Sequence, residues 1–472
     1  MNVSELPGPV AVRRSLASPH AAPCHRRTLL RAHIVGIASL FACTPSDPTD
    51  RALRPLSEDP TFAVVLSDRT STAIALLDVD GEVIDSAWIH SGSALPGLNA
   101  ALSGDVVLPS SPGPKGQLTL LDRYRSDVIT RFDLRSGTLI GQLRLRTPEE
   151  SEPSFSSNPQ DLVFVDPRAP SAWVTRFGIA LAPPDANAGV NTGRSGELGN
   201  DIVEVDTERM VLTGRRRTLS AFNTLVDTRA VYARPSALVA QEGAIVVGLS
   251  RLSLAFDTAA DGVIAIFSPT PYTSSSGDTG STSNAEDVAP ISARPLEGLA
   301  NCGQVTRVPG TRNEVLVSCV GFSHPFGDAV QVRATSGFGI FMAANGTLTA
   351  MSTWRAADHA NAPNPTASAI AIAPNLVVGI EPGQSPATPD TLYVIDLSSD
   401  EAHALVHSMH AYELGTPAFD PATGLLLVPD ASRGIHRFRF NEGQRAFTEL
   451  PRLDLGVRDG LPPREVRRIA PE

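Results

Sequence analysis

One repeated pattern constrains the fold of this chain more than any other feature of its sequence. A run of alternating apolar residues leads into a turn rich in Asp, Asn and Gly, and a second alternating run follows. Alternation has the period of a half-buried strand, and these turn residues favour tight reversals, so each copy predicts a β-hairpin. The copies lie at 74–85, 128–141, 201–214, 262–271, 339–350, 392–404 and 435–448.

A second pair of short apolar runs precedes the hairpins. In one unit these runs are 160–167 and 171–178, and in another they are 367–375 and 376–383. Four strands in each of seven units predict an all-β fold, a seven-bladed β-propeller built of four-stranded antiparallel blades. Two β-sandwich domains are the alternative, because short strands separated by regular turn signals fit that architecture too.

Two short motifs add a family resemblance to this pattern. "WVTR" (173–176) and "LYVID" (392–396) resemble the repeats of the YVTN-type seven-bladed propellers of bacterial surface and periplasmic proteins. By its rhythm the resemblance covers residues 61–472. It implies a propeller in which the connections between second and third strands share one face with the connections between blades. Propellers of this type include lactonase-like enzymes, so the fold permits catalysis without implying it.

The two ends of the repeat region predict how the propeller closes. The first unit supplies only three strands, 62–68, 72–78 and 83–91, whereas the C-terminal segment 461–472 is in surplus. Its "PPREV" (462–466) echoes "NPQDL" (158–162), which opens an inner strand. We therefore expect residues 464–469 to complete blade one beside residues 62–68, which removes the open edges of the first and last blades.

The N-terminal segment has the features of an export signal. Arg26, Arg27 and Arg31 precede an apolar run, 34–42, that is too short to span a membrane. "LFAC" (40–43) resembles a bacterial lipobox, which implies cleavage after residue 42 and lipidation of Cys43. The predicted parts are then a signal peptide (1–42), a lipidated tether (43–60) and the propeller (61–472). The alternative is an ordinary secretory signal, and the export route, general or twin-arginine, stays open.

The predicted localisation is the bacterial cell envelope, as an outer-membrane lipoprotein that faces the periplasm or the cell surface. Thr44, rather than Asp, follows the cysteine, which by resemblance to known sorting rules favours the outer membrane. Beyond residue 42 the chain has 34 basic and 49 acidic residues, a net charge of −15. That charge argues against nucleic acid as a partner. We expect a monomer, attached to the membrane by its lipid, with an envelope protein, peptide or acidic glycan as its partner.

Two cysteines in the predicted propeller are placed to form a bridge. Cys302 and Cys319 lie about equally far from the turn "PGTRN" (309–313), so they face each other across adjacent strands. In an exported protein such a pair predicts a disulfide, which stabilises the fold by about 3 kcal/mol in the chain-entropy account. The alternative is two buried free thiols.

Catalytic and metal-binding signatures are missing from the sequence. It has no GxSxG, GxxxxGK[ST], GxGxxG or CxxCH motif, and we expect neither a cofactor nor a metal. His403, His407 and His410 have the spacing of a metal-binding helix face, but we place them on the outer strand of blade six. The preferred function is a non-catalytic binding platform. A lactonase- or hydrolase-like enzyme with its site at the channel mouth is the alternative, and a structural envelope component is a third hypothesis.

A charged or titratable residue recurs where each second strand ends. The predicted ligand-binding residues are Arg69, Arg125, Arg176, Arg251, His324, Glu381 and Arg433. In a closed ring these positions encircle one face, where several guanidinium groups would accept an acidic ligand. Blades three to six have longer second-to-third connections, which predict a raised rim on the same face. The competing interpretation is that these side chains are solvated strand ends, or that the arginines pair with Asp68, Glu381 or Asp430.

Overall fold

The computed structural model describes residues 53–470, except for 124, 147–149, 151–154, 181–197, 270–289, 326–327, 360–361, 365–367, 384, 386 and 457–459. The chain divides into the units Met1–Asp47 and Pro48–Glu472, and every described residue belongs to the second unit. The predicted signal peptide and Cys43 therefore lie outside the described residues, and their assignment stays a prediction from sequence.

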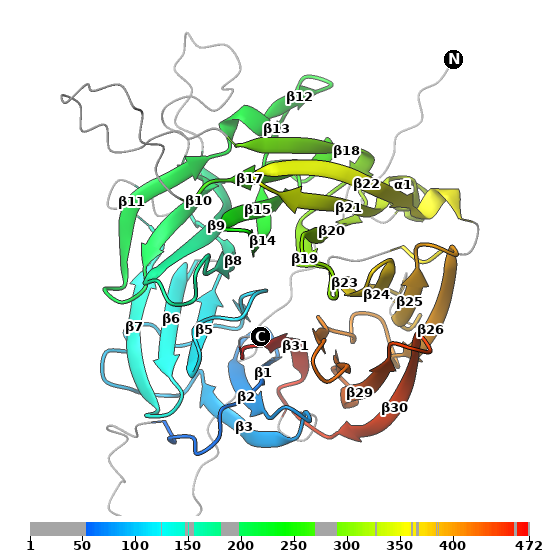
Figure 1. Ribbon diagram of the computed structural model, residues 1–472. Coiled ribbons are helices and arrows are strands. Elements are labelled where there is room, and N and C mark those ends of the chain that lie inside the picture. Colours follow the sequence, from blue (N-terminus) through cyan, green and yellow to red (C-terminus); the bar gives the residue numbers. More distant parts are fainter. Residues whose placement is uncertain are drawn as a thin grey trace, which may run out of the picture. The chain divides into compact units, whose positions relative to one another are not determined.

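The described residues form seven four-stranded antiparallel sheets, the blades of a β-propeller, and one three-stranded sheet (Figure 1). We number the blades in chain order and give the strands from the innermost outward. Blade 1 is β31 (Pro463–Arg468), β1 (Phe62–Ser67), β2 (Thr72–Leu77) and β3 (Val83–His90); blade 2 is β4 (Val106–Val107), β5 (Gln117–Asp122), β6 (Val128–Asp133) and β7 (Thr138–Arg144); blade 3 is β8 (Pro159–Val163), β9 (Ser171–Ala180), β10 (Leu198–Asp206) and β11 (Val211–Thr218). Blade 4 is β14 (Pro235–Gln241), β15 (Ala244–Leu249), β17 (Asp261–Phe267) and β18 (Ser292–Ala300); blade 5 is β19 (Gln304–Arg307), β20 (Glu314–Val320), β21 (Ser336–Ala344) and β22 (Thr347–Arg355). Blade 6 is β23 (Ile370–Ala373), β24 (Leu376–Glu381), β25 (Thr391–Asp396) and β26 (Glu401–His407); blade 7 is β27 (Ala418–Asp420), β28 (Leu425–Asp430), β29 (Gly434–Asn441) and β30 (Ala446–Leu453).

Burial decreases from the middle strands of a blade to its outer strand. All six residues of β1 (FAVVLS) and of β2 (TAIALL) are buried, because both faces of these strands pack against other blades. The outer strands β26 and β30 are largely exposed. This gradient explains the sequence pattern, in which near-continuous apolar runs precede alternating ones.

Apolar clusters join each blade to the next and close the ring. In the described residues seven such clusters lie between consecutive blades. The last of them joins Phe62 and Leu77 of blade 1 to Leu425 and Ile435 of blade 7, together with Val466. The layers between the blades thus form the core of the protein.

The C-terminal strand completes blade 1, as the sequence predicts. β31 pairs antiparallel with β1, with Phe62 opposite Arg468 and Val64 opposite Val466. The first and last strands of the propeller therefore share one sheet, near the point where Figure 1 marks the C-terminus.

The propeller begins earlier than the predicted boundary at residue 61. Leu53 and Leu56 are buried in the cluster between blades 1 and 2. The indole of Trp88 donates to the carbonyl oxygen of Arg54 at 2.9 Å, and the Leu56 amide donates to Leu134 at 3.2 Å. Leu53, Arg54 and Leu56 therefore contact the propeller, although they fall within the segment 43–60 that was predicted as a tether.

Two elements in the second-to-third connections were not predicted. The connection between β15 and β17 contains β16 (Leu252–Ser253), which joins β12 (Thr224–Val226) and β13 (Arg229–Tyr232) in the three-stranded sheet. The connection between β20 and β21 contains the helix α1 (Ala329–Thr335). Both lie on the face where the raised rim was predicted. Most of the long connection of blade 3, 181–197, lies outside the described residues.

The remaining fold predictions can be checked directly. A disulfide joins Cys302 to Cys319, as predicted. His403 and His407 are exposed on the outer strand β26, and the described residues contain no group of three or more His, Cys, Asp or Glu placed to hold a metal ion. No described helix is both long enough and apolar enough to cross a membrane.

Candidate functional site

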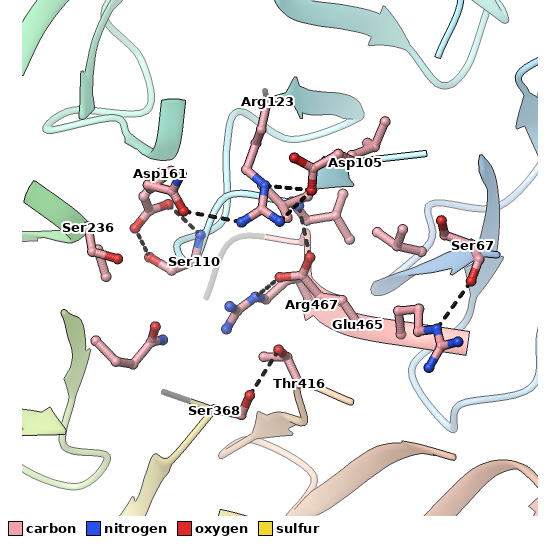
Figure 2. Close-up of a pocket in the computed structure, with 18 of the residues that line it drawn as sticks. Ser67, Asp105, Ser110, Arg123, Asp161, Ser236, Ser368, Thr416, Glu465 and Arg467 are labelled. Atoms are coloured by element: carbon pink, nitrogen blue, oxygen red, sulfur yellow. Dashed lines mark hydrogen bonds and ion pairs between the residues drawn. The ribbon is translucent and has the colours of Figure 1, made fainter. Parts of the chain in front are cut away.

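A polar cavity of about 640 Å³ opens at the end of the channel where the inner strands begin (Figure 2). All seven blades contribute to its wall. The polar residues that line it are Ser67, Arg69, Arg464, Glu465 and Arg467 from blade 1, Asp105, Ser110 and Arg123 from blade 2, Gln160 and Asp161 from blade 3, Ser236 from blade 4, Gln304 from blade 5, Ser368 preceding blade 6, and Thr416 preceding blade 7. The described lining includes neither histidine nor cysteine.

Asp161 joins three consecutive blades at the wall of this cavity. One carboxylate oxygen accepts hydrogen bonds from the backbone N–H groups of Ser110 and Leu162, each at 2.8 Å. The other accepts from the Leu238 N–H at 2.8 Å and from the Ser110 hydroxyl at 2.5 Å. Burial raises the pKa of Asp161, and the donors from Leu238 and Ser110 partly oppose that shift. Its oxygens are occupied by the fold.

Glu465 has the corresponding position in blade 1. It accepts from the Leu108 N–H at 3.3 Å, and Arg467 donates to its other oxygen at 2.7 Å. Each of these two acids therefore ties its inner strand to the following blade. Arg123 is also paired, since its Nε donates to Asp105 at 3.0 Å and its Nη1 to Gln160 at 3.1 Å (Figure 2).

The Arg464 side chain and the Arg69 backbone both bond to Ser67 at the end of β1, and both residues line the cavity. The Nε of Arg464 donates to the Ser67 carbonyl oxygen at 3.1 Å, and its Nη1 donates to Tyr412 at 3.2 Å. Two residues after Ser67, the Arg69 amide donates to the Ser67 hydroxyl at 2.9 Å. Burial lowers the pKa of Arg464, and the positive charge of Arg69 lowers it further. The two guanidinium groups thus repel each other at the cavity.

The loop that carries Arg69 is pressed against blade 2. A Cβ atom on Gly104 would lie 2.2 Å from the backbone carbon and oxygen of Arg69, so only glycine fits there. The Ser67 hydroxyl donates to the Gly104 carbonyl oxygen at 2.9 Å. Asp68 accepts from the amides of Thr70 and Ser71, at 2.8 and 2.7 Å, and fixes the turn. The position of the Arg69 backbone is therefore well determined.

Gln304 lines the cavity from blade 5. Its Nε2 is buried and has no hydrogen-bond partner among the described residues. Blade 5 is three blades from blade 1 in one direction around the ring and four in the other, so Gln304 lies across the channel from Arg464. A buried amide without a partner is costly, but this atom has almost no accessible surface, so a ligand in the cavity does not reach it.

Of the seven predicted ligand-binding residues, only Arg69 lines the cavity. Arg176 is 1% exposed and bonds to Asp201 and Glu150 at 2.7 and 2.6 Å. Burial disfavours its charged form, but these two carboxylates outweigh that effect and hold the pKa of Arg176 above its ordinary value. The prediction that Arg176 belongs to an anion-accepting mouth is therefore wrong, because its charge is already used inside the protein.

The other five residues are not at the cavity: Glu381 is the last residue of the second strand β24, and the other four lie on connections between second and third strands. The Arg251 side chain donates to the carbonyl oxygens of Phe222 and Asp261, at 3.2 and 2.9 Å. The Arg433 side chain donates to the carbonyl oxygen of His407 at 3.1 Å. Glu381 accepts from the Asn364 amide at 3.0 Å. Arg125 and His324 are exposed, and neither lines the cavity. The proposed meeting of Arg125, Arg176 and Arg251 at one mouth does not occur.

The residues that do line the cavity come mainly from the starts of the inner strands. A signal for them was present in the sequence, because the echo between 158–162 and 462–466 contains Gln160, Asp161, Arg464 and Glu465. That echo was used only to place a strand. Its polar residues, directly after a proline at the mouth of a channel, also marked the site.

Fold and site together define a seven-bladed β-propeller with a polar cavity at one end of its channel. No protein-family model matches the chain, and no curated protein sequence matches it. Solved structures resemble it at low identity. A putative 6-phosphogluconolactonase from Bacteroides fragilis is 10% identical, with a TM-score of 0.46 over 88% of this chain and 99% of that one.

Two further structures are equally distant from this chain. A protein from Lactobacillus plantarum is 10% identical, with a TM-score of 0.47 over 87% of this chain and 99% of that one. The C-terminal WD40 domain of Sif2 is 7% identical, with a TM-score of 0.43 over 87% and 84%. These similarities are too remote to bear on function, and the fold rests on the sheet topology.

Proposed function

We propose that this chain is a lipid-anchored β-propeller of the bacterial cell envelope that binds a protein, peptide or glycan without catalysis. The ligand site is the cavity at the channel mouth, and the anchor is Cys43. The lipobox resemblance and the export signal support the anchor.

One observation carries the binding proposal. The cavity wall takes polar residues from all seven blades, and Arg464 presents there N–H groups that no described residue uses. A site whose donors are positioned but not used by the protein is suited to bind a ligand. Two of the three acids at the cavity, Asp161 and Glu465, accept backbone hydrogen bonds, and the Ser110 hydroxyl donates to Asp161, so these groups serve the fold. No described feature favours the lactonase- or hydrolase-like alternative.

The test is a ligand screen combined with a variant that fills the cavity. The full chain is assayed against arrays of envelope glycans and peptides, in parallel with Gln304→Trp and with the control Ser352→Trp on the exposed outer strand β22. We expect at least one ligand that binds the wild type and Ser352→Trp, fails to bind Gln304→Trp, and is recovered chemically unchanged. Ligands that bind Gln304→Trp as well as the wild type would refute the location of the site, and a converted ligand would refute the absence of catalysis.

A further inference from the structure

The charged groups at the cavity are not balanced by one another. Four arginines and three acids line it. Arg123 pairs with Asp105, and Arg467 pairs with Glu465. Asp161 is occupied by backbone and hydroxyl donors. Among the described residues, this leaves Arg69 and Arg464 with no carboxylate bonded to either guanidinium.

The surroundings hold Arg464 in place while leaving donors available. Its bonds to Ser67 and Tyr412 use Nε and one N–H of Nη1, so both hydrogens of Nη2 and one of Nη1 remain. The backbone of Tyr412 is itself fixed, because its amide donates to the buried carboxylate of Asp390 at 2.9 Å. Glu413, whose negative charge acts on Arg464, itself accepts from the amides of Met409 and His410.

We infer that Arg69 and Arg464 form an anion site for a carboxylate or phosphate group of the ligand. This inference rests on the proposed function, since it names the chemistry of the ligand that the cavity takes. Guanidinium groups present forked N–H donors that match the oxygens of both anions. A hydroxylated acid, free or at the end of a chain, fits such a site, because its anionic group meets the arginines and its hydroxyl groups meet the polar wall.

Electrostatics supports the same assignment. The repulsion between the two guanidinium groups lowers the pKa of Arg464, and an anion bound between them converts that repulsion into two attractions. The protein as a whole carries a net charge of −11, so this cavity with its uncompensated arginines differs in sign from the molecule around it. A local positive field of this kind selects anions against an acidic background.

The experiment measures binding of simple probes to the full chain by titration calorimetry. The probes are D-glucuronate, inorganic phosphate and the uncharged D-glucuronamide, each at concentrations up to about 10 mM, which covers millimolar affinity. The variants are Arg69→Gln and Arg464→Gln. The control is Arg312→Gln, an exposed arginine in the β19–β20 turn, at the opposite end of the channel.

We expect glucuronate, phosphate or both to bind, and glucuronamide to bind at least tenfold more weakly than glucuronate if glucuronate is the ligand. Loss of a charge-assisted bond should lower the affinity about 10- to 100-fold in Arg69→Gln and Arg464→Gln. Arg312→Gln should bind as the wild type does. Binding of only one anion identifies whether a carboxylate or a phosphate is preferred. Failure of both anions to bind, or binding unchanged in both cavity variants, overturns the inference.

The two proposals can fail separately. If the screen finds an uncharged ligand that Gln304→Trp loses, while neither anion binds, the binding function stands and the anion site does not. If the anions bind through Arg69 and Arg464 but the screen finds no glycan, peptide or protein, the anion site stands and the proposed class of envelope ligand fails.

Discussion

Asp161→Asn gives a direct test of how the ring of inner strands is held together. Asp161 is 3% exposed, and each of its oxygens accepts two hydrogen bonds. With the asparagine oxygen facing the amides of Ser110 and Leu162, the new NH₂ group faces the Leu238 N–H. The Ser110 hydroxyl can reverse and accept, so the Leu238 amide is the one donor left without an acceptor.

An unsatisfied buried donor costs about 1–3 kcal/mol, and we expect Asp161→Asn to lower the free energy of unfolding by about that amount. Asp161→Leu removes the acceptor of all three backbone amides, so its expected cost is about 3–9 kcal/mol, comparable to the whole stability of many proteins. Comparing the two variants therefore separates the loss of one hydrogen bond from the loss of all the hydrogen bonds by which Asp161 joins the three blades.

Urea unfolding followed by tryptophan fluorescence measures the free energy of unfolding of each variant. An unchanged slope of that free energy against urea concentration shows that the variants and the wild type have comparable unfolded states. The control is Asp166→Asn in the exposed turn of the same blade, where the change should stay within about 0.5 kcal/mol. Equal stability of Asp161→Asn and the wild type would refute the argument that these hydrogen bonds join the blades.

Four further predictions follow from particular contacts. Gly104→Ala places a Cβ against the backbone of Arg69, so titration calorimetry should show weaker anion binding, while the melting temperature changes only slightly. Unchanged anion binding would contradict this prediction. Deletion of residues 461–472 removes β31 and should lower the melting temperature by about 5 °C or more, and a truncated protein as stable as the whole would refute the closure. Burial raises the pKa of Asp430, but hydrogen bonds from His436 and the Ser432 amide outweigh burial, so the net pKa lies below the ordinary 3.8. The ionised carboxylate therefore stabilises the fold above about pH 4, and this stabilisation is lost as the pH falls further. The difference in melting temperature between wild type and Asp430→Asn should narrow below about pH 4, and a constant difference would contradict the argument. Cys43→Ser should abolish incorporation of labelled fatty acid and release the protein from the membrane fraction, and retention there would refute the anchor.

The sequence predicted the blades because their signal is local. Six of the seven expected hairpins correspond to paired third and outer strands. The hairpin expected at 262–271 is wrong, because the described part of that segment contains only β17, and its outer partner β18 begins at residue 292. The closing strand was also predictable, because a count of strands left the first unit one short. The small sheet of β12, β13 and β16 was missed, since strands of two to four residues produce no measurable periodicity.

The candidate site was only partly predictable, because the sequence identifies equivalent positions but not their partners. Arg69, Arg125 and Arg251 each follow a second strand and share a left-handed backbone, with φ of 70°, 71° and 51°. The pattern therefore recognised a real structural equivalence among them. What distinguishes them is what surrounds each side chain, and that depends on contacts between blades.

Arg69 and Arg176 show how strongly these surroundings decide function. Arg176 is held by Asp201 from its own blade and by Glu150, so its charge is neutralised inside the fold. Arg69 has beside it Arg464, a residue almost four hundred positions away in sequence, which is brought there only because β31 closes the ring. The closure that completes blade 1 thus also creates the one pair of arginines at the cavity that no described carboxylate neutralises. Ring closure and anion binding should therefore be lost together when β31 is removed, whereas Arg464→Gln should abolish anion binding and leave the ring closed.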